Sequence, residues 1–197
     1  MLERTFIIAE IASAHYGEKK NIIKLAKAAT KAHFDAVKIQ IFNTKNFVST
    51  FNPSFKILKK IEFDFKEWAK IVEDLKNIKT NFIAEIFDYE SLLFCERLKI
   101  FNIYKISASC VYEKKIIEKI LSLKKNTIIA VGGMQFNEIK SIHNKFLKKK
   151  INYCIMIGHQ NFPTHLKDLN LNKIKFIKDK LNCTVGFSDH VNADQKL

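Results

Sequence analysis

The 197-residue sequence is poor in the residues that interrupt regular structure: it has five glycines and two prolines. It is also poor in arginine, with only Arg4 and Arg97, so lysine supplies nearly all of its formal net charge of +14. Proteins that read nucleic acids depend on arginine for forked contacts with bases and phosphates. The lysines are spread over every amphipathic segment rather than gathered in one stripe. We therefore predict that the protein does not bind nucleic acid.

Paired cysteine motifs and long apolar runs are also missing. The four cysteines are widely spaced and form no C-x-x-C pair: Cys95, Cys110, Cys154 and Cys183. This spacing argues against a thiolate zinc site and against a disulfide framework, and it fits a reducing cytoplasm. The N-terminus has no signal-like apolar run, and no stretch approaches the roughly 20 apolar residues of a membrane span. We predict a cytoplasmic protein that does not contact membranes.

What the sequence has is a regular alternation of apolar runs and lysine-rich amphipathic segments. The runs are nearly continuous in apolar residues, as strands buried on both faces should be. They lie at residues 5–12, 36–42, 81–87, 104–109, 127–133, 153–158 and 183–188. Apolar residues at helical spacing predict helices over residues 21–33, 65–78, 113–123, 137–147 and 170–181. The longest connection, residues 43–66, is predicted to be a loop.

Strand–helix repetition predicts parallel strands, in either an open doubly wound sheet or a (β/α)₈ barrel. No G-x-G-x-x-G follows the first strand, which weakens the case for a dinucleotide-binding sheet. Polar residues recur where strands end, and in a barrel those ends meet at one mouth where active sites form. Seven strands can be counted and an eighth cannot, although a barrel typically needs about 250 residues.

Two lysines stand out within apolar runs. Lys38 and Gln40 are two residues apart and therefore share one strand face. Lys105 repeats the arrangement with Ser107 and Ser109. A buried lysine needs an anion to neutralise it, and two lysines aimed at one mouth would suit a phosphate or a carboxylate. Each lysine could equally reach solvent from the strand edge.

Further candidates follow other strands. Glu10 ends the first run and could take part in proton transfer, whereas His15 in the next loop is more often structural in such a position. The stretch "GHQNFPTH" offers Gln160 to a polyhydroxy ligand, or is ordinary loop polarity. In "GFSDH", Ser188 and His190 share a face, and His190 is a possible metal ligand.

Taken in order, these stretches resemble the N-acetylneuraminate (sialic acid) synthase family, the NeuB-like enzymes. The matching pieces run from residue 7 to residue 190: "IIAEIASAHYG", "FDAVKIQIF", "FDYESLLFCERLKIFNIYKISAS", "AVGGMQFNEI", "NFPTHLKDLNL" and "VGFSDH". The resemblance implies an α/β fold of the TIM-type (β/α)₈ barrel, here lacking the eighth strand and the last helix. It also implies that residues 1–197 are a catalytic barrel domain that is incomplete at its C-terminus, without the family's antifreeze-like C-terminal domain.

The family condenses phosphoenolpyruvate with an N-acylated aminosugar, typically N-acetylmannosamine, and releases phosphate with the help of Mn²⁺ or Mg²⁺. By position, the resemblance implies that Lys38, Lys105 and Ser188 bind phosphoenolpyruvate. It gives Glu10 and Gln40 catalytic places facing the sugar. It implies that Gln160 and Phe162 contact the sugar and that His190 binds the metal. Full-length members are expected to form homodimers.

The sequence also departs from the family pattern. Glu85 stands where the family has a threonine that helps bind the phosphate, and a carboxylate there would repel phosphate unless it faces elsewhere. Phe162 replaces a sugar-contacting tyrosine, and Ala108, Cys110 and Ala130 also differ. We interpret these changes as divergent specificity.

Because the family's second metal histidine lies beyond "SDH", we expect weak Mn²⁺ binding through His190 alone and negligible turnover. We also expect unpaired strand edges that promote association. Two alternatives remain: an inactive fragment or pseudoenzyme acting through a partner chain, and a basic binding protein without catalysis.

Overall fold

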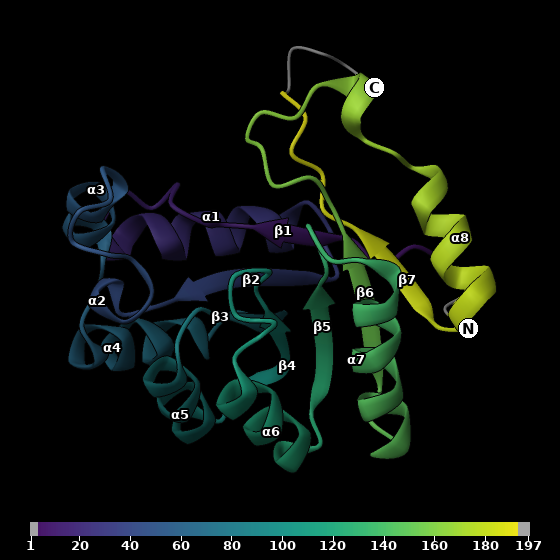
Figure 1. Ribbon diagram of the computed structural model, residues 1–197. Coiled ribbons are helices and arrows are strands. Elements are labelled where there is room, and N and C mark those ends of the chain that lie inside the picture. Colours follow the sequence, from purple (N-terminus) through teal and green to yellow (C-terminus); the bar gives the residue numbers. More distant parts are fainter. Residues whose placement is uncertain (1–3, 193–197) are drawn as a thin grey trace. The chain divides into compact units, whose positions relative to one another are not determined.

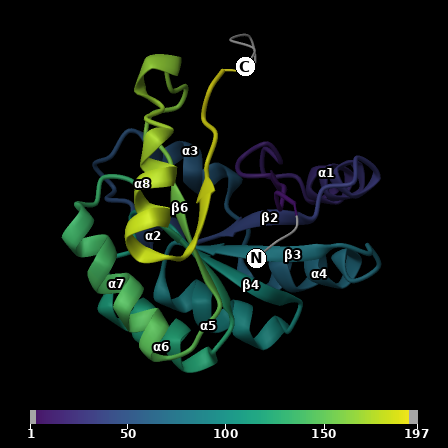
Figure 2. The same ribbon diagram turned by 90° about the vertical axis from the view of Figure 1, so that its right-hand side faces the viewer.

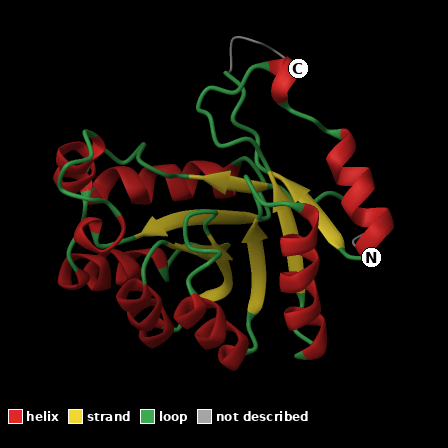
Figure 3. Cartoon of the chain, viewed as in Figure 1, coloured by secondary structure: helices red, strands yellow, loops and turns green. Residues whose placement is uncertain are grey.

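The computed structural model describes residues 4–192 and shows an alternation of strands and helices along the chain (Figures 1 and 3). The strands are β1 (Ile8–Glu10), β2 (Ala36–Ile41), β3 (Asn81–Ile86), β4 (Phe101–Ile106), β5 (Asn126–Ala130), β6 (Tyr153–Ile157) and β7 (Thr184–Phe187). The helices are α1 (Lys19–Lys31), α2 (Thr44–Phe47), α3 (Ser54–Ile61), α4 (Phe65–Leu75), α5 (Tyr89–Leu98), α6 (Lys114–Leu123), α7 (Phe136–Lys148) and α8 (Asn172–Leu181), with a short 3₁₀ helix, η1 (Leu166–Asp168).

Neighbouring strands of the sheet follow chain order, β1-β2-β3-β4-β5-β6-β7. The β1–β2, β2–β3, β5–β6 and β6–β7 pairings are parallel. A sequential parallel order is that of a TIM-type barrel, whereas a doubly wound sheet reverses direction at a switch point. The α/β class and the seven predicted strands are therefore confirmed for residues 4–192. The finer prediction, a TIM-type barrel that lacks its eighth strand and last helix, stays a prediction.

The chain forms two compact units, Met1–Tyr104 and Lys105–Leu197. In the first unit, α1 packs on β2 and on α4, and α5 packs on β3. Helix α4 shows why: Trp68, Ile71, Val72 and Leu75 recur at helical spacing and are all buried. Asp64 and Glu67 begin this helix with a capping box, which satisfies two backbone amides that would otherwise lack acceptors.

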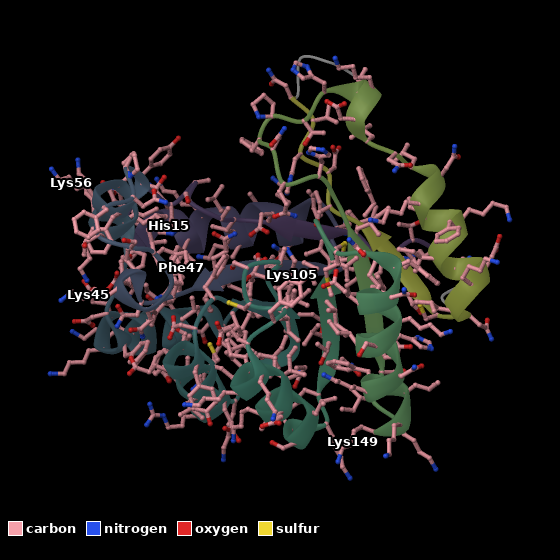
Figure 4. All side chains as sticks on the ribbon, in the orientation of Figure 1. His15, Lys45, Phe47, Lys56, Lys105 and Lys149 are labelled. Carbon is pink, nitrogen blue, oxygen red and sulfur yellow. The ribbon has the colours of Figure 1, made fainter. Side chains whose placement is uncertain are left out.

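In the second unit, α8 packs on β7, and the two lie side by side in Figure 2. Helix α7 buries Ile139, Ile142, His143 and Phe146. His143 is buried among these apolar side chains, and its Nδ1 is satisfied there by a hydrogen bond with the Tyr153 hydroxyl of β6, at 2.6 Å. Lys149 follows α7 and projects outward from the unit (Figure 4).

Three expectations about elements are wrong. The connection 43–66 is not a plain loop, because it holds α2 and α3. The fourth strand spans Phe101–Ile106 rather than residues 104–109, because Phe101 is a buried strand residue while Ala108 and Ser109 lie in a turn. Helix α5 was not predicted, since its buried face includes Ser91 as well as Leu92, Phe94 and Cys95, which blurs the apolar pattern.

No disulfide joins the cysteines, all of which lie within residues 4–192. Burial raises the pKa of the Cys154 thiol to about 12, which keeps it protonated and unreactive. No helix in residues 4–192 is long and apolar enough to cross a membrane.

The packing of α4 gives the first prediction. Ile71→Ala removes a side chain with no solvent exposure and leaves a cavity, so it should lower the free energy of unfolding by about 2–5 kcal/mol. The neighbouring exposed Lys70→Ala is the matched control and should change it by less than about 0.5 kcal/mol. Urea unfolding followed by circular dichroism measures both. Equal effects of the two variants would contradict the packing described for this helix.

Candidate active site

The carboxyl ends of β1, β2 and β3 bring together four polar side chains of the first unit. Parallel pairing sets Glu10 opposite Lys38 and Gln40 opposite Glu85. Because side chains alternate along a strand, residues 38 and 40 share a face with their partners. The register alone therefore places two carboxylates, one amide and one ammonium group on one face of the sheet.

Lys38 lies at the centre of this cluster. Its Nζ forms ion pairs with Oε2 of Glu10 and Oε2 of Glu85. The Gln40 amide also donates to Oε2 of Glu85, at 3.3 Å. Lys38 is 6% exposed and Glu85 is 4% exposed, whereas the Glu10 side chain is 37% exposed. The alternative that Lys38 reaches solvent is wrong, and Lys38 and Gln40 share a strand face as predicted.

The loops around this cluster are held by structural polar groups. Asp88 caps α5 through the Ser91 amide at 2.9 Å and accepts from the backbone of Asn43 at 2.8 Å. It therefore ties the loop after β3 to the loop after β2. Sequence reasoning did not assign this carboxylate a role, although its place three residues before a serine is typical of a helix cap.

His15 lies in the loop after β1 and is buried against the Phe63 ring, with centroids 5.2 Å apart. Its Nδ1 accepts from the backbone N–H of Gly17 at 3.0 Å, so the neutral ring carries its proton on Nε2. Gly17 has a φ of +74°, and a Cβ there would lie 3.1 Å from the Lys60 carbonyl, which favours glycine. His15 is thus structural, the reading favoured by the sequence.

In the second unit, Lys105 lies near the end of β4 and is buried, at 7% exposure (Figure 4). Because it is buried, Lys105 is not the solvent-reaching lysine of the alternative interpretation. Just after β4, the Oγ atoms of Ser107 and Ser109 lie 2.8 Å apart.

A cavity of about 370 Å³ opens in the second unit. Its lining includes Gly132, Gly133, Gln160, Asp168, Asn170 and Lys173. Gln160, predicted to contact a sugar, lies against Gly132, where an added Cβ would come within 2.0 Å of the amide nitrogen. Sequence reasoning missed Asp168, Asn170 and Lys173, and the only signal for them was their place in and just after the quoted stretch "NFPTHLKDLNL".

His190 and Phe162 lie together in the second unit. Their rings meet edge to face with centroids 5.9 Å apart. The Nδ1 of His190 is 2.7 Å from the His159 carbonyl oxygen, which can only accept, so Nδ1 carries the proton. This leaves the lone pair on Nε2, the arrangement of a histidine ready to bind a metal.

Backbone hydrogen bonds hold the residues around His190 in place. The Ser188 N–H donates to the Ile157 carbonyl at 2.7 Å, and Thr164 N–H donates to the His190 carbonyl at 2.7 Å. The Asp189 side chain accepts from the Val191 amide and so has a local structural role. Within residues 4–192, no group of three histidine, cysteine or acidic side chains could hold a metal ion.

The order of the strands defines the class of protein: an α/β protein whose strands follow one another as in a TIM-type barrel. Comparison with known proteins gives the family. The NeuB family model matches residues 25–195, and the chain belongs to that family.

Two curated relatives are similar to the chain over most of its length. It is 27% identical to the N,N'-diacetyllegionaminic acid synthase of Campylobacter jejuni, over 98% of this chain and 62% of that protein. It is 31% identical to an uncharacterized protein of Methanocaldococcus jannaschii, over 95% of this chain and 56% of that protein. The chain thus spans about three fifths of the length of these curated relatives.

Solved structures agree with the family assignment. The N-acetylneuraminic acid synthetase of Leptospira borgpetersenii, determined in complex with citrate, superposes with a TM-score of 0.89 at 25% identity, over 96% of this chain and 66% of that one. A DAHP synthase of Thermotoga maritima superposes with a TM-score of 0.72 at 10% identity, a likeness of fold alone. The resemblance seen in the sequence is confirmed.

The burial of His15 gives a prediction about pH. Burial lowers the pKa of His15 below its ordinary value of 6.5, so the unfolded chain takes up this proton first as the pH falls. The stability that depends on neutral His15 is complete above pH 6.5 and is lost as the pH falls toward the lowered pKa of the folded state. Protonation of Nδ1 would also remove the acceptor of the Gly17 amide.

His15→Asn keeps an acceptor for that amide but does not titrate. The loss of unfolding free energy between pH 7.5 and pH 5 should therefore be smaller in this variant than in the parent. Burial lowers the pKa of His143 as well, so part of the pH dependence should remain. Urea unfolding at a series of pH values measures it, with exposed His33→Asn as the control. An unchanged pH dependence in His15→Asn would refute the assignment.

Proposed function

We propose that this chain is the phosphoenolpyruvate-binding catalytic part of a sugar-acid synthase. The observation that carries the proposal is membership of the NeuB family over residues 25–195, together with relatives named as synthases of legionaminic and pseudaminic acids. The reaction joins C3 of phosphoenolpyruvate to the aldehyde carbon of an open-chain N-acylated aminosugar. Water adds at C2, and the C2–O bond to phosphate breaks to release inorganic phosphate.

The residues of the second unit have defined tasks in this proposal. Lys105 neutralises the phosphate or the carboxylate of phosphoenolpyruvate, because a buried ammonium is stabilised by an anion. Ser188 adds a hydroxyl to the same ligand. Gln160, which lines the cavity beside Gly132, donates to sugar hydroxyls, and Phe162 covers an apolar part of the sugar. Charges that develop on the departing phosphate are stabilised by such preset donors.

The residues of the first unit act on protons and on the sugar. Glu10 is the more exposed of the two carboxylates on Lys38, and its Oε1 accepts from the Ala12 amide at 3.0 Å, which fixes its direction. It is the group proposed to orient the aldehyde or to move a proton. Gln40 is proposed to face the sugar as well. The cytoplasm and a homodimer remain our expectations for location and assembly.

A divalent cation, Mn²⁺ or Mg²⁺, is expected from the family, and His190 is the residue proposed to hold it. Its tautomer fits this role, since Nδ1–H is directed at the His159 carbonyl and Nε2 is available. When bound, such a cation would polarise the aldehyde oxygen as a Lewis acid. His190 is one ligand, and residues 4–192 offer no cluster of three, so we expect weak binding.

The proposed reaction is tested by incubating the protein with phosphoenolpyruvate, Mn²⁺ and either N-acetylmannosamine or a diacetamido aminosugar. Aminosugar-dependent phosphate release and a sugar acid detected by mass spectrometry would identify the reaction, and its rate should be very low because His190 is the one histidine proposed to hold the cation. In Lys105→Met the affinity for phosphoenolpyruvate should fall at least tenfold, because a charge-assisted contact is worth about 1.5–3 kcal/mol. Exposed Lys115→Met is the control, and calorimetric titration measures binding.

The results separate this function from its two alternatives. Binding that requires Lys105, without turnover on any aminosugar, would favour an inactive family member. Binding lost equally in the Lys105 and Lys115 variants, and weakened by salt, would favour a basic binding protein without a specific anion site.

A separate prediction concerns the cation. His190→Gln removes the imidazole and should abolish Mn²⁺ binding measured by electron paramagnetic resonance, whereas exposed His165→Gln should leave it unchanged. Undiminished Mn²⁺ binding by His190→Gln would remove His190 from the cation site.

A further inference from the structure

The cluster around Lys38 contains more negative than positive formal charge. One ammonium group is in contact with two carboxylates, so the formal charge of the three groups at neutral pH is 1 − 2 = −1. Phosphoenolpyruvate carries a phosphate and a carboxylate, both negative. The two carboxylates in contact with Lys38 weaken its attraction for such a ligand.

The two ion pairs of Lys38 differ in how much free energy their separation would cost. The Glu10 side chain is 37% exposed, so it can turn toward water at small cost. The Glu85 side chain is 5% exposed and accepts from both Lys38 and Gln40 through the same oxygen. Separating Glu85 from Lys38 would break an ion pair between two buried side chains, which is strongly unfavourable.

We propose that Glu85 occupies the place of an external anion on Lys38 and is a specificity-determining residue of this chain. Lys38 then contributes little to binding phosphoenolpyruvate, and ligand anions depend on other groups, Lys105 first among them. This inference rests on the proposed function only because that function identifies the anion as phosphoenolpyruvate. The masking of Lys38 itself rests on the contacts and burial within the first unit.

The backbone supports this assignment. Register pairs Gln40 with Glu85 and sets Lys38 one step along the same face, so the Glu85 carboxylate reaches the ammonium without leaving its strand. A threonine at position 85 would be shorter and uncharged and would present a hydroxyl instead. Replacement of this single side chain therefore changes the charge of the cluster from −1 to 0 while β3 keeps its pairing.

The test compares the affinities of the full chain and its variants for phosphoenolpyruvate and for inorganic phosphate by calorimetric titration. Glu85→Gln keeps the shape of the side chain, and Glu85→Thr is a second variant of different shape. Each should bind both anions at least tenfold more tightly than the parent. The gain should disappear in the double variant Glu85→Gln/Lys38→Gln, because the ammonium that gains access is then absent.

Two controls separate this effect from a change in overall charge. Glu73→Gln removes an exposed carboxylate from α4 and should leave both affinities within twofold of the parent. Glu10→Gln should raise them by less than threefold, because Glu10 can already turn toward water. A larger gain from Glu10→Gln than from Glu85→Gln would overturn the assignment to Glu85. Circular dichroism verifies that each variant is folded.

The inference and the proposed function fail in different ways. Equal phosphate affinity of the parent, Glu85→Gln and Glu85→Thr would overturn the masking of Lys38, whatever the enzyme activity. So would a gain that survives in the double variant. Failure of the proposed function would instead be seen as phosphoenolpyruvate binding that does not depend on Lys105. A phosphate gain through Lys38 would still support the masking in that case.

Discussion

The buried ion pair between Lys38 and Glu85 is the constraint on which the first unit depends. An ammonium inside a sheet is costly unless an anion lies against it, and a carboxylate on the next strand supplies that anion without any ligand. A slip of one residue between β2 and β3 would put Glu85 on the opposite face of the sheet from Lys38 and Gln40. The same pair therefore favours the observed register and, in our proposal, also determines which ligands Lys38 can bind.

In the second unit, backbone groups rather than ion pairs position the polar side chains. Gly132 leaves room for the Gln160 amide, and the His159 carbonyl fixes the tautomer of His190. The Ser188 and His190 backbones bond to Ile157 and Thr164, which holds the segment after β7 in place. The backbone contacts leave the Ser188 hydroxyl unused, and the contact of His190 with His159 uses Nδ1 and leaves Nε2. That is the condition for a hydroxyl, an amide and an imidazole to remain available to a ligand.

Sequence reasoning predicted the strands well because each is a short apolar run that needs no partner information to be recognised. It also predicted that Lys38 and Gln40 share a face, since alternation along a strand is local. It could not predict that Glu85 neutralises Lys38, because that contact depends on the register of residues 45 or more positions apart. Helix α5 was missed for a related reason: Ser91 is buried there because Asp88 bonds to it, and a polar residue on the inner face hides the helical period. Cavity residues such as Lys173 are likewise brought together by the fold and not by any local pattern.

Glu85 also shows why membership of a family does not by itself transfer a binding site. The strand order and the lysine positions are compatible with an anion site at the strand ends, and phosphoenolpyruvate is the anion of the proposed function. Yet the electrostatic field at Lys38 is set by the groups in contact with it, and two carboxylates of the same chain contact it, the buried Glu85 and the partly exposed Glu10. A lysine is an anion-binding residue only when its charge is not already balanced. The same scaffold can therefore carry the same lysine with opposite preferences for phosphate, and the deciding residue is found on the neighbouring strand.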